Sequence, residues 1–393
     1  MRASEPGSIM PPALSPDEAA HASAVTERIR GHIGEAGGWL SFERFMELAL
    51  YAPGLGYYSA GSAKIGAGGD FVTAPEVSDL FSRCVAEQCA AVLAGGGEIL
   101  ELGAGTGRMA ATVLAALAEH GALPERYAIL EVSADLAQRQ RERIATLPAG
   151  LRERVVWLER LPDRPLRGVI LANEVLDALP CRRFVVRGSG VGELGVALCA
   201  DSLVEREAEA DDALALACAG VFRELPEPLP EGYVSEICLR VAPWVAGVGK
   251  CLERGLMLLL DYGLPRRHYY HPQRTSGTLR CHFKQRVHDD PLINLGVQDI
   301  TAWVDFTRVA EAALECGLDV AGFATQAAFL LGTGIERRVA AAGEPVQHAR
   351  LAGEARRLIL PGEMGEAFKA MALTRDLDAP LSGFVLQDLR GSL

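Results

Sequence analysis

A short apolar segment that runs directly into three alternating glycines constrains the fold of this chain more than any other feature. Residues 98–102 are mostly aliphatic, and Gly103, Gly105 and Gly107 follow them at once. Alanine and leucine then recur at helical spacing over residues 109–118. A strand, a glycine turn and a helix in this order are typical of the first unit of an open parallel sheet. The turn is therefore predicted to lie at a ligand-binding edge.

The same alternation continues along the chain and predicts an α/β fold, a Rossmann-like parallel sheet with helices on both faces. Apolar runs predict further strands, and helical spacing predicts the helices between them. The predicted strands are 127–132, 155–158, 168–172, 255–260, 318–323 and 384–387, and the predicted helices are 76–93, 135–147, 235–254, 303–316 and 340–358.

The alternation is interrupted, and the interruptions suggest five parts. Between 184 and 206 the glycine-punctuated, period-two pattern is typical of antiparallel strands. Apolar spacing over 25–50 predicts two helices, the second capped by Ser41. The predicted parts are a flexible tail (1–20), N-terminal helices with a glycine- and aromatic-rich loop (21–94), a ligand-binding core (95–180), an inserted antiparallel subdomain (181–234), and the rest of the core with a substrate-facing irregular loop at 264–300 (235–393).

Composition excludes several classes of function. A formal net charge of -12 leaves no general attraction for a phosphate backbone, so we expect no nucleic-acid partner. The nine cysteines form no Cys-x-x-Cys pair, and His268, His271, His282 and His288 match no common ligand spacing, so we expect no metal. No apolar run is long enough to span a bilayer and no secretory signal precedes the helices, so we expect a cytoplasmic protein. The oligomeric state stays open.

The residues around the glycine turn distinguish between two classes of ligand. Dinucleotide sites require a third packing glycine where this chain has Arg108, and Glu101 would bring a carboxylate close to two phosphates. An acid before the turn suits a ligand that carries an ammonium group. A second acid, Glu131, closes the next strand, where it can bind ribose hydroxyls. Together these features predict S-adenosyl-L-methionine as the cofactor, bound by Glu101, Gly103, Gly105, Gly107, Glu131 and Asn173.

The predicted acceptor site follows the fourth strand. Asn173 and Glu174 come just past its carboxyl end, and Asp177 follows, although a turn or capping role for Asp177 is equally open. If the acceptor is a guanidinium, Glu174 and Asp177 could bind it bidentately and act as the catalytic pair. Asp261 and Tyr262 end a strand at the same edge and are candidate substrate-binding residues.

Three further candidates for substrate binding have structural alternatives. Asp70 and Glu76 flank the glycine- and proline-rich loop before the core, where Asp70 could instead cap a turn and Glu76 could begin a helix. His288 could serve as a general base or belong to a hydrogen-bond network of its loop.

Several long motifs resemble those of the MidA family of S-adenosylmethionine-dependent methyltransferases, which is related to a mitochondrial assembly factor of respiratory complex I. The matching runs are 64–78, 101–107, 172–180, 260–263, 277–280, 288–291 and 299–306. The resemblance implies a class I methyltransferase core with an added substrate-facing subdomain. It also implies protein arginine methylation, giving symmetric dimethylarginine on a complex I subunit, and hence a protein partner with an accessible arginine.

Two alternatives stay open at this point. The same core could serve a small-molecule O- or N-methyltransferase, or a donor-binding assembly factor with little turnover.

Overall fold

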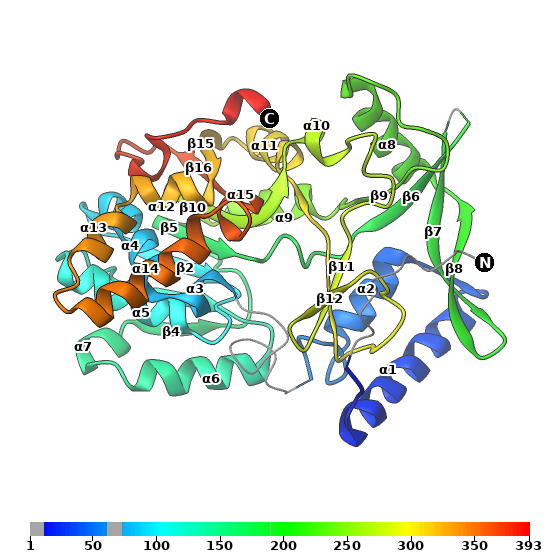
Figure 1. Cartoon of the computed structure of the whole chain (residues 1–393), viewed down its shortest axis with the longest axis horizontal. Coiled ribbons are helices and arrows are strands. Elements are labelled where there is room, and N and C mark those ends of the chain that lie inside the picture. The colour runs from blue at the N-terminus through cyan, green and yellow to red at the C-terminus, as the bar shows by residue number, and fades with distance from the viewer. Residues whose placement is uncertain (1–11, 61–72, 189) are drawn as a thin grey trace. The chain divides into compact units, whose positions relative to one another are not determined.

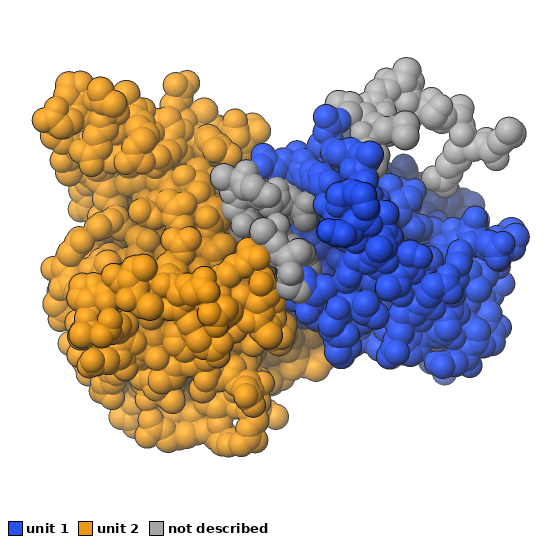
Figure 2. All heavy atoms as spheres, turned by 90° about the horizontal axis from the view of Figure 1, so that it is seen from below, with its two compact units in different colours: residues 1–72, 178–239, 270–302 blue, residues 73–177, 240–269, 303–393 orange. Residues whose placement is uncertain are grey.

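A computed structural model describes residues 12–60, 73–188 and 190–393, and the chain divides into two compact units (Figure 2). Unit 1 is formed by residues 1–72, 178–239 and 270–302, and unit 2 by residues 73–177, 240–269 and 303–393. The predicted parts differ from this division, because the chain leaves the sheet of unit 2 twice. Residues 73–94, assigned to the N-terminal part, belong with the ligand-binding core, and 270–302 belong with the N-terminal helices.

Unit 2 is built on a mixed sheet with the strand order β15-β16-β10-β5-β2-β3-β4, and β14 pairs with β10 (Figure 1). Neighbouring strands from β4 to β10 are parallel, whereas β16 is antiparallel to both β10 and β15. The strands are β2 (Glu98–Leu102), β3 (Tyr127–Leu130), β4 (Val155–Leu158), β5 (Leu166–Asn173), β10 (Leu252–Leu264), β14 (Val304–Asp305), β15 (Asp319–Thr325) and β16 (Phe368–Arg375).

Helices connect these strands, and short helices and turns join the rest of unit 2. They are α3 (Ala74–Val77), α4 (Asp79–Leu93), α5 (Arg108–Glu119), α6 (Ala134–Ala145), α7 (Ala149–Arg152), α9 (Val241–Gly249), α10 (Arg266–Tyr269), α11 (Phe306–Glu315), α12 (Gln326–Gly332), α13 (Ile335–Ala340), α14 (Pro345–Ile359), α15 (Met364–Ala367), and the 3-10 turns η1 (Ser382–Phe384) and η2 (Arg390–Ser392).

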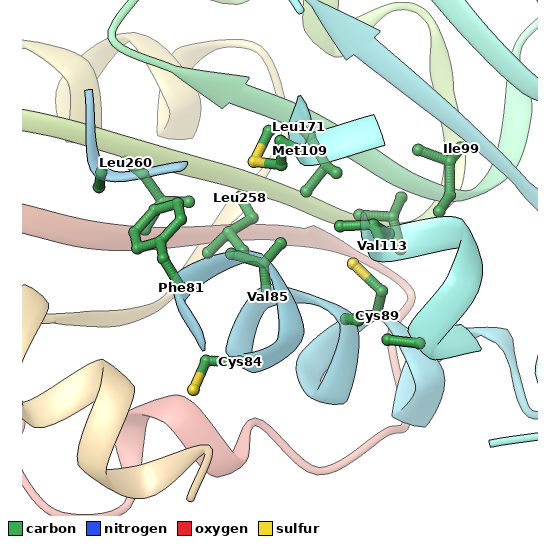
Figure 3. Close-up of a cluster of buried hydrophobic side chains, with 14 of the residues drawn as sticks. Phe81, Cys84, Val85, Cys89, Ile99, Met109, Val113, Leu171, Leu258 and Leu260 are labelled. Carbon is green, nitrogen blue, oxygen red and sulfur yellow. The ribbon is translucent and has the colours of Figure 1, made fainter. Parts of the chain in front are cut away.

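Both faces of the central strands are buried, which confirms the predicted α/β class. On β10, Leu258 and Leu260 pack with Phe81 of α4 in one apolar cluster (Figure 3). Because side chains alternate along a strand, Met257 and Leu259 point to the opposite face, and they are buried as well. Each buried side chain of this size contributes roughly 1.5–3 kcal/mol to folding, so the sheet is held from both sides.

Several predicted elements of unit 2 are wrong in detail; the helix expected at 340–358, for instance, begins only at Pro345. The helix expected at 76–93 is broken at Ser78, which ends α3 and caps α4. No strand forms at 384–387: Phe384 ends the turn η1 and packs on Phe329, residues 385–387 are irregular, and β16 takes the sheet position. The helix expected at 235–254 begins only at Val241, because the preceding residues form a strand that pairs in unit 1.

Unit 1 contains an antiparallel sheet and a smaller three-stranded one, covered by helices of the N-terminal segment. The predicted antiparallel strands within 184–206 are present, whereas the loop predicted as irregular at 264–300 contains the second sheet. The elements are α1 (Pro16–Glu35), β1 (Trp39–Ser41), α2 (Phe42–Tyr51), β6 (Arg182–Arg187), β7 (Gly190–Cys199), β8 (Ser202–Glu209), α8 (Asp212–Glu224), β9 (Val234–Ile237), β11 (Arg280–Phe283), β12 (Arg286–His288) and β13 (Asp299–Thr301).

Local capping explains where the N-terminal helices begin. The tail predicted for 1–20 is too long, because Ser15 and Glu18 form a capping box and α1 begins at Pro16. Ser41 caps α2 as predicted, accepting the N–H of Arg44. Over the described ranges, no helix is both long enough and apolar enough to cross a membrane.

Candidate functional site

The glycine turn joins β2 to α5 as predicted, and its conformation requires glycine. Gly103, Gly105 and Gly107 have φ values of 65°, 53° and 79°, in the left-handed region that side chains disfavour. A Cβ on Gly107 would lie 3.1 Å from the Cα of Gln140 on α6. The turn therefore keeps bare backbone between the sheet and α6, at the carboxyl edge where parallel sheets bind ligands.

Glu101 lies beneath this turn and is 1% exposed. The hydroxyl of Tyr127 donates to its Oε2 at 2.7 Å, while Oε1 accepts no hydrogen bond from the described residues. Burial raises the pKa of the Glu101 carboxyl to about 7, although the Tyr127 hydrogen bond opposes the shift. A buried carboxylate oxygen without a partner is costly, so this group is suited to a cationic or hydrogen-bonding ligand.

Glu131 follows β3 directly, as the sequence predicts. Its Oε1 accepts the N–H of Ser133 at 2.9 Å and its Oε2 accepts Nε2 of Gln140 at 2.8 Å. Burial raises the pKa of Glu131, and both hydrogen bonds act in the opposite direction. Beside it, Val132 is 75% exposed and offers an apolar surface, although it was not among the predicted site residues. The signal available in the sequence was an apolar residue directly after the acid that ends a strand.

Glu76 lies against the glycine turn. The Thr106 hydroxyl donates to its Oε1 at 2.5 Å, and Arg108 donates to its backbone oxygen at 2.7 Å. Arg108 also donates to Asp79 at the start of α4, at 2.9 Å. The arginine that stands in place of a packing glycine thus ties the start of α5 to α3 and α4. Asp70, the companion candidate, lies outside the described residues.

Glu174 occupies a backbone conformation that is rare for its residue type. It directly follows Asn173, the last residue of β5, and its φ is 53°. Its N–H donates to the oxygen of Leu260 at 2.8 Å, and Asn173 Nδ2 donates to its Oε1 at 3.1 Å. Such a conformation costs roughly 1–3 kcal/mol and persists only where the surrounding structure holds it.

Asp261 holds the loop that follows Glu174. Its Oδ2 accepts the backbone N–H groups of Val175, Leu176 and Asp177 at 3.2, 2.9 and 3.3 Å. Its Oδ1 accepts the N–H of Tyr262 at 2.8 Å, and the residue is 2% exposed. Burial, followed by the neighbouring Asp177 and Glu174, raises the pKa of Asp261 well above its usual range. Asp261 was predicted as a substrate-binding residue, but its carboxylate accepts four backbone N–H groups, so its role in the structure is to fix the conformation of this loop.

Asp177 and Tyr262 form a pair at the same edge. The Tyr262 hydroxyl donates to Asp177 Oδ2 at 2.5 Å, and Asp177 is buried. The Tyr262 ring packs edge-on against Phe368, the first residue of β16. The structure therefore brings Asn173, Glu174, Asp177, Asp261 and Tyr262 together. Asp261 and Tyr262 were expected to end their strand, but β10 continues to Leu264, because Gly263 and Leu264 pair with β14.

His288 belongs to unit 1, where it ends β12. The N–H of Asp290 lies 3.3 Å from its Nδ1, a contact within its own loop that matches the structural alternative considered for it. Burial lowers the pKa of His288. In the ranges that the structure describes, no group of three or more His, Cys, Asp or Glu side chains could hold a metal ion.

The residues around the turn fit the predicted donor. A buried carboxylate oxygen on Glu101, bare glycine backbone and the oriented Glu131 carboxylate complement an ammonium group, a carboxylate and ribose hydroxyls, respectively.

Comparisons with known proteins agree with this geometry. The family model described as "Putative S-adenosyl-L-methionine-dependent methyltransferase" matches residues 82–324. A solved structure from Burkholderia thailandensis that holds S-adenosyl-homocysteine is 40% identical, with a TM-score of 0.92, covering 98% of this chain and 100% of that one.

Curated relatives are similar over most of their length. "Protein arginine methyltransferase NDUFAF7, mitochondrial" from Danio rerio is 28% identical over 92% of this chain and 90% of its own length. The human protein of that name is 25% identical over 86% and 80%. The expected cytoplasmic location is contradicted by these relatives, because they are mitochondrial proteins.

Proposed function

The chain belongs to the family of putative S-adenosyl-L-methionine-dependent methyltransferases, and we propose that it transfers the methyl group to an arginine side chain of a protein. The enzyme class and the cofactor follow from the family and from the similar structure that holds S-adenosyl-homocysteine. The arginine acceptor is supported by the names of the curated relatives and by the carboxylates at the edge of unit 2.

In the proposed site, the donor supplies a methyl group on a positively charged sulfur. Glu131 accepts hydrogen bonds from the ribose hydroxyls, and the backbone N–H groups of the glycine turn bind the carboxylate of the methionine end. The free oxygen of Glu101 faces the ammonium group. Val132 offers its exposed side chain to the adenine ring.

Glu174 is the residue that we assign to the acceptor. A guanidinium has a pKa above about 12, so the enzyme must orient it and localise its charge. Glu174 can bind two of its nitrogens and hold the positive charge away from the third. That nitrogen bonds to the methyl carbon as the carbon–sulfur bond breaks, S-adenosyl-homocysteine leaves, and the methylated nitrogen loses one proton to solvent water, which restores the single positive charge of the guanidinium. Asp177, held by Tyr262, adds negative charge beside it.

The observation that carries this proposal is the left-handed backbone of Glu174, directly before the loop whose N–H groups bind the Asp261 carboxylate. Strained conformations of this kind are retained where function requires them. The symmetric product and a complex I acceptor stay predictions from the resemblance.

Labelled donor provides the test. The purified protein is incubated with S-adenosyl-L-[methyl-³H]methionine and extract from cells that lack the gene, and the labelled protein is hydrolysed for amino-acid analysis. We expect label in dimethylarginine, a loss of at least tenfold in Glu174→Gln, and no loss in Glu315→Gln, an exposed control on α11. Label confined to small molecules would identify a small-molecule methyltransferase, and no label would identify a donor-binding assembly factor. Either result overturns the proposal.

A further inference from the structure

Gln140 of α6 is completely buried and connects the two parts of the donor site that are far apart in the sequence. One amide N–H is directed to each of two acceptors: Nε2 lies 2.9 Å from the oxygen of Gly105 and 2.8 Å from Oε2 of Glu131. The amide oxygen accepts Nε1–H of Trp157 on β4 at 3.0 Å. The side chain thus uses both of its donors and its acceptor within unit 2.

The three contacts together determine the orientation of the amide. If the amide were rotated by half a turn, its oxygen would face the Gly105 oxygen and the Glu131 carboxylate, and its NH₂ would face the Trp157 N–H. Every contact would then be repulsive. Trp157 is itself fixed beside α6, with the Arg141 guanidinium 5.1 Å above its ring.

The position of Gln140 also depends on the glycine turn. The Cα of Gln140 lies so close to Gly107 that a Cβ there would come within 3.1 Å of it. Because Gln140 and the N–H of Ser133 bind different oxygens of Glu131, the plane of that carboxylate is fixed relative to the turn.

We propose that Gln140 is a positioning residue for the methyl donor: its amide fixes the Glu131 carboxylate at the distance from the glycine turn that the donor requires. This inference rests on the assignment of Glu131 to the ribose hydroxyls. An amide donor at Oε2 also favours the ionised carboxylate, which accepts hydrogen bonds from both hydroxyls without competing for a proton.

The test is calorimetric titration with S-adenosyl-homocysteine, which requires no acceptor. Gln140→Leu keeps the size of the side chain and removes its hydrogen bonds, and we expect at least a tenfold rise in Kd. Gln138→Leu is the matched control on the same helix, because Gln138 is exposed and bonds only to Glu142 among the described contacts. Its Kd should stay within twofold of the wild type.

Gln140→Glu separates positioning from a merely structural role. A carboxylate at this place would face Glu131, and the pair would share a proton at low pH. We expect the Kd of Gln140→Glu for S-adenosyl-homocysteine to approach that of the wild type as the pH falls from 8 to 6. A ratio of the two Kd values that is equal at every pH overturns the inference.

Two further variants keep the result interpretable. Trp157→Phe keeps an aromatic, although smaller, ring and removes the N–H that orients the amide. We expect a two- to fivefold rise in Kd even if Gln140→Leu does not fold. An unchanged Kd in Trp157→Phe or in a folded Gln140→Leu overturns the role of Gln140, provided that Glu131→Gln binds at least tenfold more weakly. If Glu131→Gln binds S-adenosyl-homocysteine like the wild type, the assignment of Glu131 to the ribose hydroxyls is wrong, and the inference that rests on it is overturned with it. The labelling experiment on the acceptor is independent of all these Kd values.

Discussion

The Asp261 carboxylate accepts the backbone N–H of Leu176 at 2.9 Å, and so a side chain of β10 determines the conformation of the loop that follows β5. The two residues are 85 positions apart in the chain. Val175 and Asp177 donate to the same oxygen, and the loop presents Glu174 directly before them.

Asp261→Asn should loosen this loop. An asparagine side chain can accept on one side only, so its NH₂ would face backbone N–H groups either at residues 175–177 or at Tyr262. We expect a loss of about 1–3 kcal/mol in the free energy of unfolding by urea, together with reduced methyl transfer. Asp378→Asn, at an exposed position, is the control. Equal stability of Asp261→Asn and the wild type would contradict the role of the Asp261 carboxylate in fixing the loop.

Glu174→Gly should stabilise the fold while it abolishes transfer. Glycine adopts the φ of 53° without the cost that glutamate incurs, and the N–H bond to Leu260 is kept. We expect the free energy of unfolding to rise by about 1 kcal/mol, measured by urea titration beside a methyl-transfer assay. A destabilised Glu174→Gly would show that the left-handed backbone is not strained.

Glu101 should make stability depend on pH in a defined direction. Burial raises the pKa of its carboxyl from 4.5 to about 7, so the protonated form is favoured by folding. The corresponding stability is fully present below pH 4.5 and is lost as the pH rises through 7. Between pH 5 and pH 8, the wild type should lose roughly 2–3 kcal/mol relative to Glu101→Gln, which has no such proton. Parallel stability curves for the two proteins, in urea unfolding at each pH, would rule this out.

Gly107→Ala should be more damaging than its backbone angle alone explains. Gly107 and Gly121 have similar φ values of 79° and 66°, but only at Gly107 would a Cβ meet another helix, at Gln140. Each alanine should cost about 1 kcal/mol for the backbone. Gly107→Ala should lose further stability and weaken S-adenosyl-homocysteine binding, whereas Gly121→Ala should bind normally. Thermal melts and calorimetry measure the two effects, and equal losses in both variants would contradict the contact.

Local signals in the sequence were sufficient for the core of unit 2. The strands at 98–102 and 155–158 have the predicted bounds, because a buried parallel strand is a short apolar run wherever it lies. The glycine turn and the acid after β3 were predicted for the same reason, since both are adjacent in the chain to the strands that position them. The errors fell where distant packing decides the structure, as at Phe384 and at the strand of residues 234–237.

The sequence alone therefore determined the fold class, the glycine turn after β2 and the acids near the carboxyl edge, because strand periodicity and turn chemistry act over a few residues. Only the tertiary structure decided what each acid does. Asp261 binds backbone beneath the loop, Glu76 binds Thr106 at the glycine turn, and Gln140 joins that turn to Glu131. Between nine and 86 positions of the chain separate these partners, and no local pattern records which buried groups a folded chain brings within hydrogen-bonding distance.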